Sequence, residues 1–256
     1  MSEVTLSPQK TENKNHRPSK TWRGWSGITN ADSTYSVAMR ETIASINHEA
    51  LAQHASNVRA RLEASPGNPI PCTIDMSLFT VGWYNIVFEV AFEDGVYWIA
   101  RVRREPEVEE DLGSESERTT ELESEVYTML YIKTNSTIPV PTVYDFASKR
   151  DPVIGCRFIL MEALAGQPGT ERLRDFIPLE HRVKTYTQLA DVKLQLSQLR
   201  FSKIGRLTGT GFGEENLQFS IDAFVPHGCL DSRTSGPYES TRILPRYQTS
   251  RFAKGL

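Results

Sequence analysis

Large apolar residues change their spacing several times along the chain, and each change predicts a different element. Between Val37 and Leu62 they recur at helical intervals, and Pro66-Gly67-Asn68-Pro69 ends this pattern. From Ile86 to Val90 larger apolar residues alternate with other residues, which is typical of a strand with one buried face. Val96 to Val102 follows after Glu93-Asp94-Gly95, whose glycine suits a tight hairpin turn. The pattern predicts a leading helix followed by two antiparallel strands.

Helical spacing returns in the middle of the chain. Apolar residues recur at helical intervals from Leu122 to Leu130, and Thr120 and Glu123 have the spacing of a capping box. A helix from about Thr120 to Thr134 is therefore predicted. The segment before it, Glu105 to Glu117, is acidic and has no apolar periodicity, so a solvated loop fits it better than a metal site does.

Shorter apolar runs and another helix follow. Ile138 to Phe146 begins with Ile-Pro-Val-Pro, which holds the backbone extended and predicts an edge-like strand. Arg157 to Met161 predicts a buried strand, and Gly166-Gln167-Pro168-Gly169 a turn. Pro178 to Phe201 has helical periodicity, and beyond Ile204-Gly205 the pattern decays into Gly, Ser, Thr and Pro. The predicted fold class is α+β.

Composition describes a globular protein and excludes some partners. A chain of 256 residues with 39% hydrophobic and 24% charged residues can bury a sizeable core. A net charge of −3 gives no overall attraction to nucleic acid or anionic lipid. The polar segment from Met1 to Thr34 holds few large apolar groups and is expected to be a flexible tail.

The cysteines and the hydropathy indicate the cellular compartment of the protein. Cys72, Cys156 and Cys229 are far apart, which argues against a disulfide framework or a zinc site and fits a reducing compartment. No apolar run has the length of a membrane span or of a signal peptide core. We expect a cytoplasmic protein, with the nucleus as an alternative.

Two segments have residues suited to binding a polyphosphate. Gly82, between two predicted strands, lets backbone approach a triphosphate, and Asn85 can brace that turn through its amide. A simple hairpin kink is the alternative at Gly82. Arg101 ends the second strand and can hold phosphates, and Glu125 on the following helix can hold the arginine in place. Glu125 can equally be one more solvated helix glutamate.

A third segment has exposed backbone at the end of a strand. Met161-Glu162-Ala163 closes the buried strand and leads into a glycine-containing turn. Such backbone can pair with the edge of an adenine, and this role does not depend on side chains. A strand end without a ligand is the alternative reading. Gly209-Thr210-Gly211-Phe212-Gly213 is a poor phosphate loop, because no strand clearly precedes it and no helix follows.

These segments occur in the order seen in a known family. Five of them resemble the fungal type of the aminoglycoside phosphotransferase family: Gly82-Trp83-Tyr84-Asn85, Phe92 to Arg101, Ser124-Glu125-Val126, Ile138 to Tyr144, and Ile159 to Glu162. The resemblance covers roughly Cys72 to Leu207. It implies a protein-kinase-like fold, ATP with Mg²⁺, and a small hydroxylated molecule as phosphate acceptor.

The resemblance also implies an organisation into lobes. We expect a flexible tail over 1–35, a kinase-like small lobe with a leading helix over 36–165, and a truncated, partly helical large lobe over 166–256. By position, Arg101, Glu125 and the Met161 to Ala163 segment take the ATP-binding roles. The helix around Leu189 to Leu199 is expected to lack part of its cover, which predicts self-association through that surface.

The catalytic part of the family pattern is missing. The family's His-x-Asp-x-x-x-x-Asn loop does not occur, and His227-Gly228-Cys229-Leu230-Asp231 has the wrong spacing. We therefore assign no catalytic and no metal-binding residue. Two functions remain open: a small-molecule kinase whose catalytic half lies outside this sequence, and a non-catalytic kinase-like binding or scaffold module. An unrelated α+β domain is a third reading.

Overall fold

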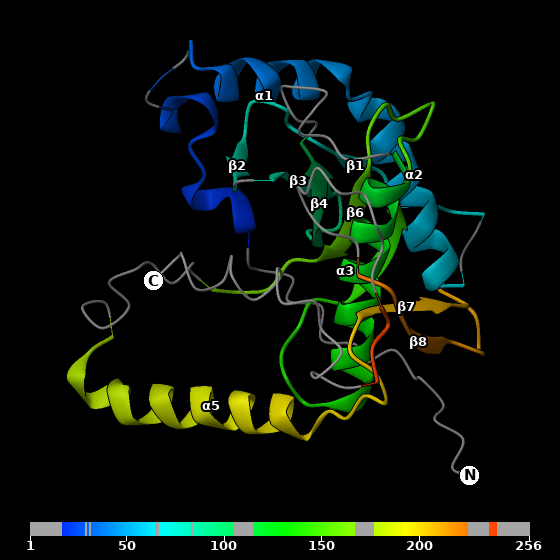
Figure 1. Cartoon of the computed structure of the whole chain (residues 1–256). Coiled ribbons are helices and arrows are strands. Elements are labelled where there is room, and N and C mark those ends of the chain that lie inside the picture. The colour runs from blue at the N-terminus through cyan, green and yellow to red at the C-terminus, as the bar shows by residue number, and fades with distance from the viewer. Residues whose placement is uncertain are drawn as a thin grey trace. The chain divides into compact units, whose positions relative to one another are not determined.

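The structure is a computed structural model that describes residues 17–28, 30, 32–64, 67–82, 84–104, 115–166, 177–224 and 236–239 (Figure 1). The chain divides into two compact units, Met1–Arg104 with Asp151–Gly166, and Glu105–Arg150 with Gln167–Leu256. The helix and strand within Glu105–Arg150 group with the second unit. Each unit is mixed α+β, as predicted for the chain.

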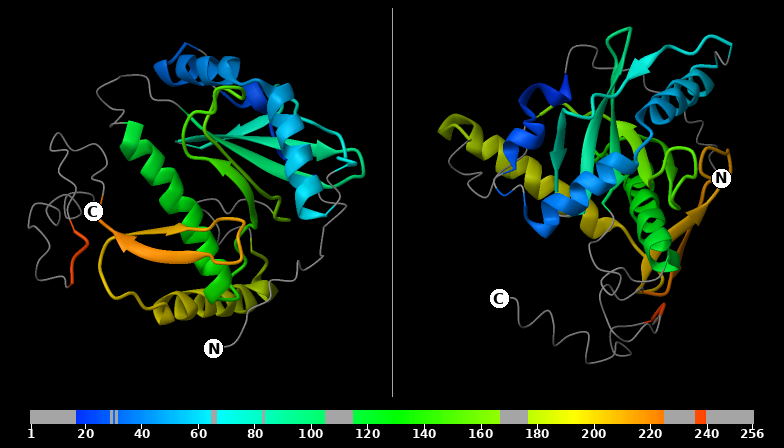
Figure 2. Two further views of the ribbon diagram at one scale, coloured as in Figure 1. Left: turned by 90° about the vertical axis from the view of Figure 1, so that its right-hand side faces the viewer. Right: turned by 90° about the horizontal axis from the view of Figure 1, so that it is seen from above.

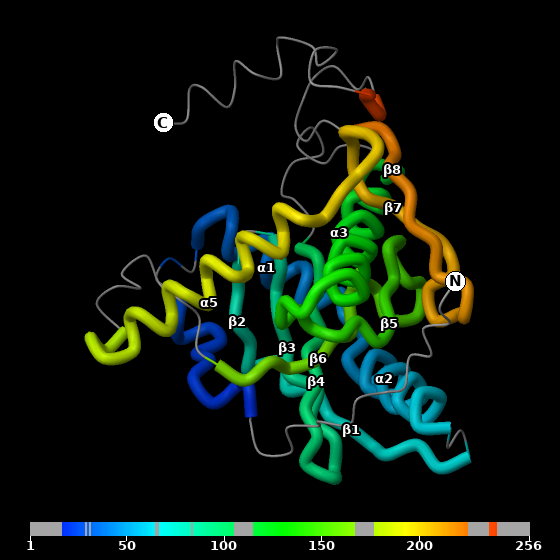
Figure 3. Tube along the Cα trace, turned by 90° about the horizontal axis from the view of Figure 1, so that it is seen from below, coloured from blue at the N-terminus to red at the C-terminus, as the bar shows by residue number. Residues whose placement is uncertain are grey.

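The first unit contains most of the strands. Its elements are η1 (Pro18–Thr21), η2 (Gly24–Gly27), α1 (Thr34–Ser45), α2 (His48–Leu62), β1 (Cys72–Thr73), β2 (Phe79–Val81), β3 (Asn85–Phe92), β4 (Tyr97–Arg103) and β6 (Phe158–Glu162). The strands are antiparallel in the order β1-β3-β4-β6, and β2 also pairs with β3. Figure 3 traces β2, β3 and β4 side by side. Strand β4 therefore lies between β3 and β6.

The predicted β3–β4 hairpin is confirmed. Gly95 has a φ of 82°, a conformation that a side chain would strain, and its N–H donates to the Phe92 carbonyl at 3.0 Å. The register places Phe88 opposite Ala100, and Ala100 opposite Leu160 on β6. All three residues are fully buried, because this face of the sheet forms the core of the unit.

The predicted leading helix is two helices. Ser33 caps the start of α1 by accepting the Ser36 N–H, and α1 ends where Ile46 turns into extended backbone. Asn47 then caps α2, accepting the Ala50 N–H on its side chain at 3.1 Å. The Asn47 N–H donates to the Ile154 carbonyl at 2.8 Å, so the break depends on a segment distant in sequence. Helical periodicity cannot reveal such a break.

An arginine on α2 is buried among acidic partners. Arg59 donates to Asp94 through both terminal nitrogens, at 2.9 and 2.7 Å, and to Glu63 at 2.9 Å. Its guanidinium also lies over the Phe92 ring at 4.6 Å. Burial alone would lower the pKa of Arg59, but the hydrogen bonds and charges of Asp94 and Glu63 raise it above its ordinary value. This contact joins α2 to the β3–β4 turn.

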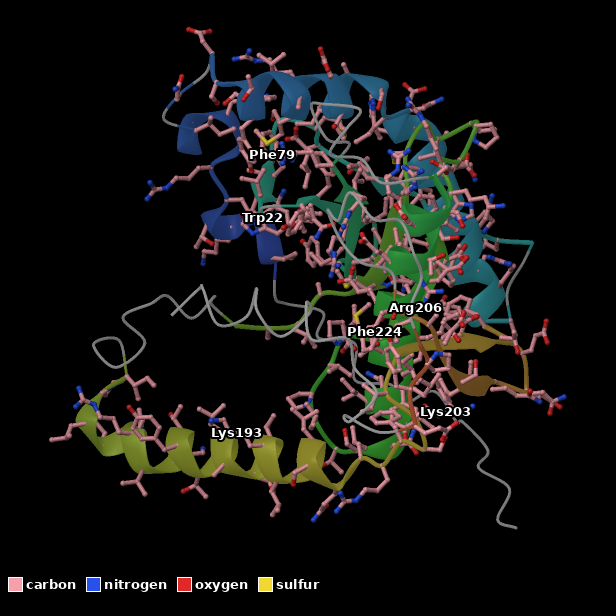
Figure 4. The ribbon with its side chains drawn as sticks, viewed as in Figure 1. Trp22, Phe79, Lys193, Lys203, Arg206 and Phe224 are labelled. Atoms are coloured by element: carbon pink, nitrogen blue, oxygen red, sulfur yellow. The ribbon has the colours of Figure 1, made fainter. Side chains whose placement is uncertain are left out.

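The expected flexible tail is wrong from residue 17 onward. Residues 17–28 form η1 and η2, and Trp25 packs edge-on against Phe79 with ring centroids 5.1 Å apart. A Cβ on Gly24, whose φ is 51°, would lie 2.1 Å from the Ser77 carbonyl oxygen, so glycine permits this close approach. Figure 4 shows Trp22 and Phe79 in this region. Residues 1–16 lie outside the described part of the chain.

The second unit is organised around α3. Its elements are α3 (Glu115–Asn135), β5 (Val143–Ala147), α5 (Leu179–Gln198), β7 (Arg206–Thr210) and β8 (Gln218–Asp222). The helix begins at Glu115, earlier than predicted, and the Thr120–Glu123 capping box is wrong. The Thr120 hydroxyl instead donates to the Ser116 carbonyl at 2.6 Å, a bond made inside the helix. Of the predicted acidic loop, residues 105–114 lie outside the described part.

A hairpin missed by the sequence pattern packs on α3. Strands β7 and β8 pair antiparallel where the apolar pattern decays (Figure 2). A Cβ on Gly209 would lie 2.5 Å from the Tyr127 ring and 2.4 Å from the Gln218 carbonyl oxygen. Glycine therefore allows β7 to approach α3. Tyr127 also meets Phe219 of β8 edge-on, with ring centroids 6.5 Å apart.

The two remaining predicted elements of this unit form with different lengths. Strand β5 starts at Val143, because Pro139 and Pro141 keep the residues before it out of regular pairing. Helix α5 forms as predicted but has no buried residue, and Val183 and Leu194 are 77% and 56% exposed. Figure 4 shows Lys193 among its projecting side chains. Among the described helices, none combines the length and the apolar character of a membrane-spanning segment.

Candidate functional site

The turn at Gly82 joins β2 to β3 and leaves its backbone open. The Gly82 N–H donates to the backbone carbonyl of Asn85 at 2.9 Å, so the observed brace uses the Asn85 main chain and not the expected amide. Among the described residues other than its chain neighbours, none lies within 4 Å of a Cβ built on Gly82. The space around this position is therefore open.

Residues outside the predicted set hold this turn. The Tyr35 hydroxyl on α1 donates to the Gly82 carbonyl at 3.1 Å, and the guanidinium of Arg104 lies over the Tyr35 ring at 4.5 Å. Arg103 lies over the Tyr84 ring at 5.2 Å. Arg103 and Arg104, which follow Arg101 in the sequence, are thus both stacked on aromatic rings. No local signal marks Tyr35 in the sequence, because its role comes from the packing of α1 near the turn.

Arg101 is on the central strand of the sheet. It lies directly opposite Val87 on β3 and Ile159 on β6, and it is half-buried. Burial, and then the charge of Arg103, lower the pKa of Arg101 from its ordinary value. An arginine still remains protonated at neutral pH, so this position supplies a partly desolvated positive charge. Such a charge attracts an anion more strongly than one in water.

The Met161-Glu162-Ala163 segment lies at the end of β6, beyond the rung of Arg101. Met161 is opposite Ile99 and Glu162 is opposite Trp98, and β6 ends at Glu162. Met161 is buried, while Glu162 and Ala163 are half-buried. The strand therefore ends as predicted, with backbone beyond Glu162 that no longer pairs regularly with β4.

These predicted residues follow one another along the sheet. The rung of Asn85 and Arg103 is next to the Gly82 turn, the rung of Arg101 comes second, and the rung of Ile99 and Met161 comes third. Successive rungs on one face are two residues apart, about 7 Å along the strands. The first unit therefore brings together Gly82, Asn85, Arg101 and the Met161 to Ala163 segment in linear order.

Glu125 belongs to the second unit. Glu125 is half-buried on α3. On the same helix, Glu123 accepts a hydrogen bond from the Ser148 hydroxyl at 2.8 Å. The pairing of Glu125 with Arg101 stays a prediction. Within the described ranges no three His, Cys, Asp or Glu side chains gather as a metal site would require.

The glycine-rich stretch at 209–213 is corrected in part. A strand does precede it, since β7 ends at Thr210, and a second strand follows it. Gly211 and Gly213 have φ values of 78° and 76°, as tight turns require. The stretch is the turn of the β7–β8 hairpin, without the helix N-terminus on which phosphate loops rely. The other weak candidate, His227 to Asp231, lies outside the described residues.

Two of the three cysteines lie in the described part of the chain. Cys72 is half-buried and Cys156 is buried. Burial raises the pKa of Cys72 to about 11, so the thiol is protonated at neutral pH. Cys229 lies outside the described residues.

Comparison with known proteins finds one structural similarity. No protein-family model matches the sequence, and no curated protein matches it significantly. The crystal structure of the Rio2 kinase–ADP/Mg²⁺–phosphoaspartate complex from Chaetomium thermophilum is similar with a TM-score of 0.38 and 15% sequence identity. The similarity covers 69% of this chain and 52% of that kinase chain, so this chain spans about half its length.

Proposed function

We propose that the first unit is a nucleotide-binding, kinase-like small lobe of the aminoglycoside phosphotransferase type. In this proposal the phosphates of Mg-ATP lie between the Gly82 turn and Arg101, and adenine lies against the backbone at Met161 to Ala163. Glu125 would hold Arg101 in place. The acceptor of the wider family would be a small hydroxylated molecule.

The observation that carries the proposal is the linear order of these groups on one sheet. An open turn beside the Asn85–Arg103 rung, a half-buried cation on the next rung and the end of β6 starting from the rung after that follow one another, and successive rungs are about 7 Å apart. A nucleotide triphosphate is elongated, with anionic groups at one end and a hydrogen-bonding base at the other. The order of the groups on the sheet matches the order of the groups in that ligand.

Arginine is a suitable cation for this position. Its planar guanidinium can bind a carboxylate and a phosphate at the same time, which a lysine ammonium does less specifically. Magnesium would arrive with the phosphates, because Mg²⁺ in such sites keeps waters and phosphate oxygens as most of its ligands. The chain's own contribution is the positive charge and the open backbone at Gly82.

The proposal concerns binding. The sequence has no His-x-Asp-x-x-x-x-Asn motif, and no residue is assigned to orient an acceptor hydroxyl. Enzymatic phosphoryl transfer needs at least about 8 kcal/mol of barrier reduction, to which metal ligands and an acceptor-orienting carboxylate contribute. We therefore propose that this chain binds nucleotide and leaves transfer to residues outside it. Self-association through the exposed side chains of α5 is part of the same proposal.

Replacing Arg101 tests the proposal. Mg-ATP at about 100 times its Kd stabilises a protein by about 2.7 kcal/mol, which raises Tm by roughly 5 to 10 °C for a chain of this size. We expect Arg101→Ala to abolish this rise, each protein being compared with its own nucleotide-free Tm. Arg101→Lys, the matched control, keeps the charge and should keep part of the rise. A rise that survives unchanged in Arg101→Ala contradicts the assignment of the phosphate contact.

A further inference from the structure

A buried carboxylate lies on the same face of the sheet as Arg101. Glu89 is directly opposite Ile99, and residues opposite one another or two apart on a strand share a face. Glu89 is only 5% exposed. A buried carboxylate requires hydrogen-bonding partners, because burying its charge alone is costly.

The partners of Glu89 come from the N-terminal segment. The backbone N–H of Ser19 donates to Glu89 Oε2 at 3.0 Å, and Arg17 Nε donates to Glu89 Oε1 at 3.0 Å. Arg17 Nε also donates to the Ser19 hydroxyl at 3.2 Å. We call residues 17–21, which comprise Arg17 and η1, the strap. These bonds hold the strap on the Arg101 side of the sheet.

On the face of β3 and β4 that carries Arg101, burial is greatest where the strap attaches. Ser19 is 2% exposed, its partner Glu89 is 5% exposed, and Ile99, opposite Glu89 on β4, is also buried. One rung nearer the Gly82 turn, Val87 and Arg101 are only half-buried. The strap therefore covers one rung of this face and leaves the Arg101 rung more open.

The covered rung is the one assigned to the base. Ile99 lies opposite Glu89 on β3 and opposite Met161 on β6, so these three residues form a single rung across the sheet. The Arg101 rung, about 7 Å away, is where phosphates would bind. A nucleotide with its phosphates at Arg101 and its base near Met161 would have to pass under the strap.

We propose that the strap is an autoinhibitory segment, and that docking of the strap and binding of nucleotide exclude one another. This inference rests on the proposed function of the first unit. With the strap released, Glu89 stands on an open face where water can solvate it, so its buried charge does not oppose release. The affinity measured for nucleotide is then the intrinsic affinity reduced by the fraction of molecules whose strap is open.

Ser19→Pro in the full chain tests the inference. Proline removes the N–H that donates to Glu89, and it disfavours helical backbone at the preceding Pro18. Losing a hydrogen bond to a charged group shifts the docking equilibrium by about tenfold, so Mg-ATP should bind about tenfold more tightly by calorimetry. Ser19→Ala is the matched control, because it keeps the N–H, and its Kd should stay within about twofold of wild type.

Hydrogen exchange reports the strap independently of nucleotide binding. The Trp22 N–H donates to the Ser19 carbonyl at 3.0 Å, so its exchange should quicken in Ser19→Pro. Saturating Mg-ATP should also quicken this exchange in the wild-type protein. Arg17→Ala removes the partly exposed ion pair with Glu89 and should tighten nucleotide binding about threefold.

The outcomes separate the inference from the proposed function. Faster Trp22 exchange with tighter Mg-ATP binding in Ser19→Pro supports both. Faster exchange with an unchanged Kd overturns the proposal that the strap excludes nucleotide, and it leaves nucleotide binding in place. Faster exchange with no nucleotide binding by the wild type or any variant overturns the proposed function, and the inference falls with it.

Discussion

The sheet of the first unit and helix α5 of the second both have a periodic apolar pattern. Their apolar side chains differ greatly in how far they are buried. Leu160 on β6 is fully buried among neighbouring strands, whereas Leu194 on α5 is 56% exposed and α5 has no buried residue. Periodicity shows which residues share a face, and it does not show whether anything covers that face. A candidate site built on the sheet is therefore on rigid support.

The largest expected effect comes from replacing leucine by alanine once on β6 and once on α5. Leu160→Ala should reduce the free energy of unfolding by about 2 to 5 kcal/mol, because it leaves a cavity in a packed core. Leu194→Ala should change it by no more than about 0.5 kcal/mol, since the side chain is mostly in water. Urea denaturation at one protein concentration measures both. A cost above about 2 kcal/mol at Leu194 would break the comparison and show that α5 is covered in solution.

Two glycines give an intermediate effect. Gly209→Ala should destabilise the second unit by about 1 to 3 kcal/mol, because the added methyl would meet the Tyr127 ring and the Gln218 carbonyl. Gly82→Ala should be nearly neutral for folding, since space around Gly82 is open. Thermal denaturation of the two variants compares them directly. If Gly82→Ala destabilises the protein as much as Gly209→Ala does, the conclusion that the Gly82 turn is open is wrong.

The smallest effect concerns two exposed carboxylates, one in each unit. Hydrogen bonds from the Ser77 hydroxyl and then its N–H lower the pKa of Asp75. The Ala223 N–H, followed by Arg206, lowers the pKa of Asp222. A carboxyl whose pKa is lowered by folding stabilises the protein above its unfolded pKa of about 3.9, and this contribution is lost as pH falls through the folded pKa.

Two substitutions distinguish a local hydrogen bond from a cross-strand arginine as the cause of a lowered carboxyl pKa. Ser77→Ala removes the hydroxyl 2.6 Å from Asp75 and should raise the pKa of Asp75 toward its ordinary value. Arg206→Gln should raise the pKa of Asp222 less, because the Ala223 N–H remains at 2.7 Å. NMR titration of each carboxyl follows both changes. A larger rise at Asp222 would show that the cross-strand arginine dominates there.

The fold was predictable where its causes are local. The β3–β4 hairpin follows from alternation and from a glycine at the turn, and the structure confirms it. The break between α1 and α2 was not predictable, because the Asn47 N–H bonds to Ile154 from a distant segment. Strand β8 was missed because it has only two apolar residues, Phe219 and Ile221, which alternate with polar ones. The hairpin that contains β8 is stabilised by its contact with α3, which the local pattern does not contain.

The candidate site was predictable to a similar degree. The residue types and order of Gly82, Arg101 and Met161 are local features, and the register places Arg101 and Met161 on neighbouring rungs. The hydrogen bond from Tyr35 to Gly82 and the strap contact with Glu89 join segments 47 and 70 or more positions apart. Nothing in the local sequence marks these partners.

The sequence by itself determined the strand and helix periods, the hairpin turn and the serial order of the candidate binding groups. These depend on backbone geometry and on neighbours a few residues away, which a linear pattern contains. Only the tertiary structure decided that η1 and η2 are ordered, that α5 is uncovered and that Glu89 is buried under Arg17 and Ser19. Burial and hydrogen bonding between distant segments depend on which surfaces meet, and composition and periodicity do not specify that meeting.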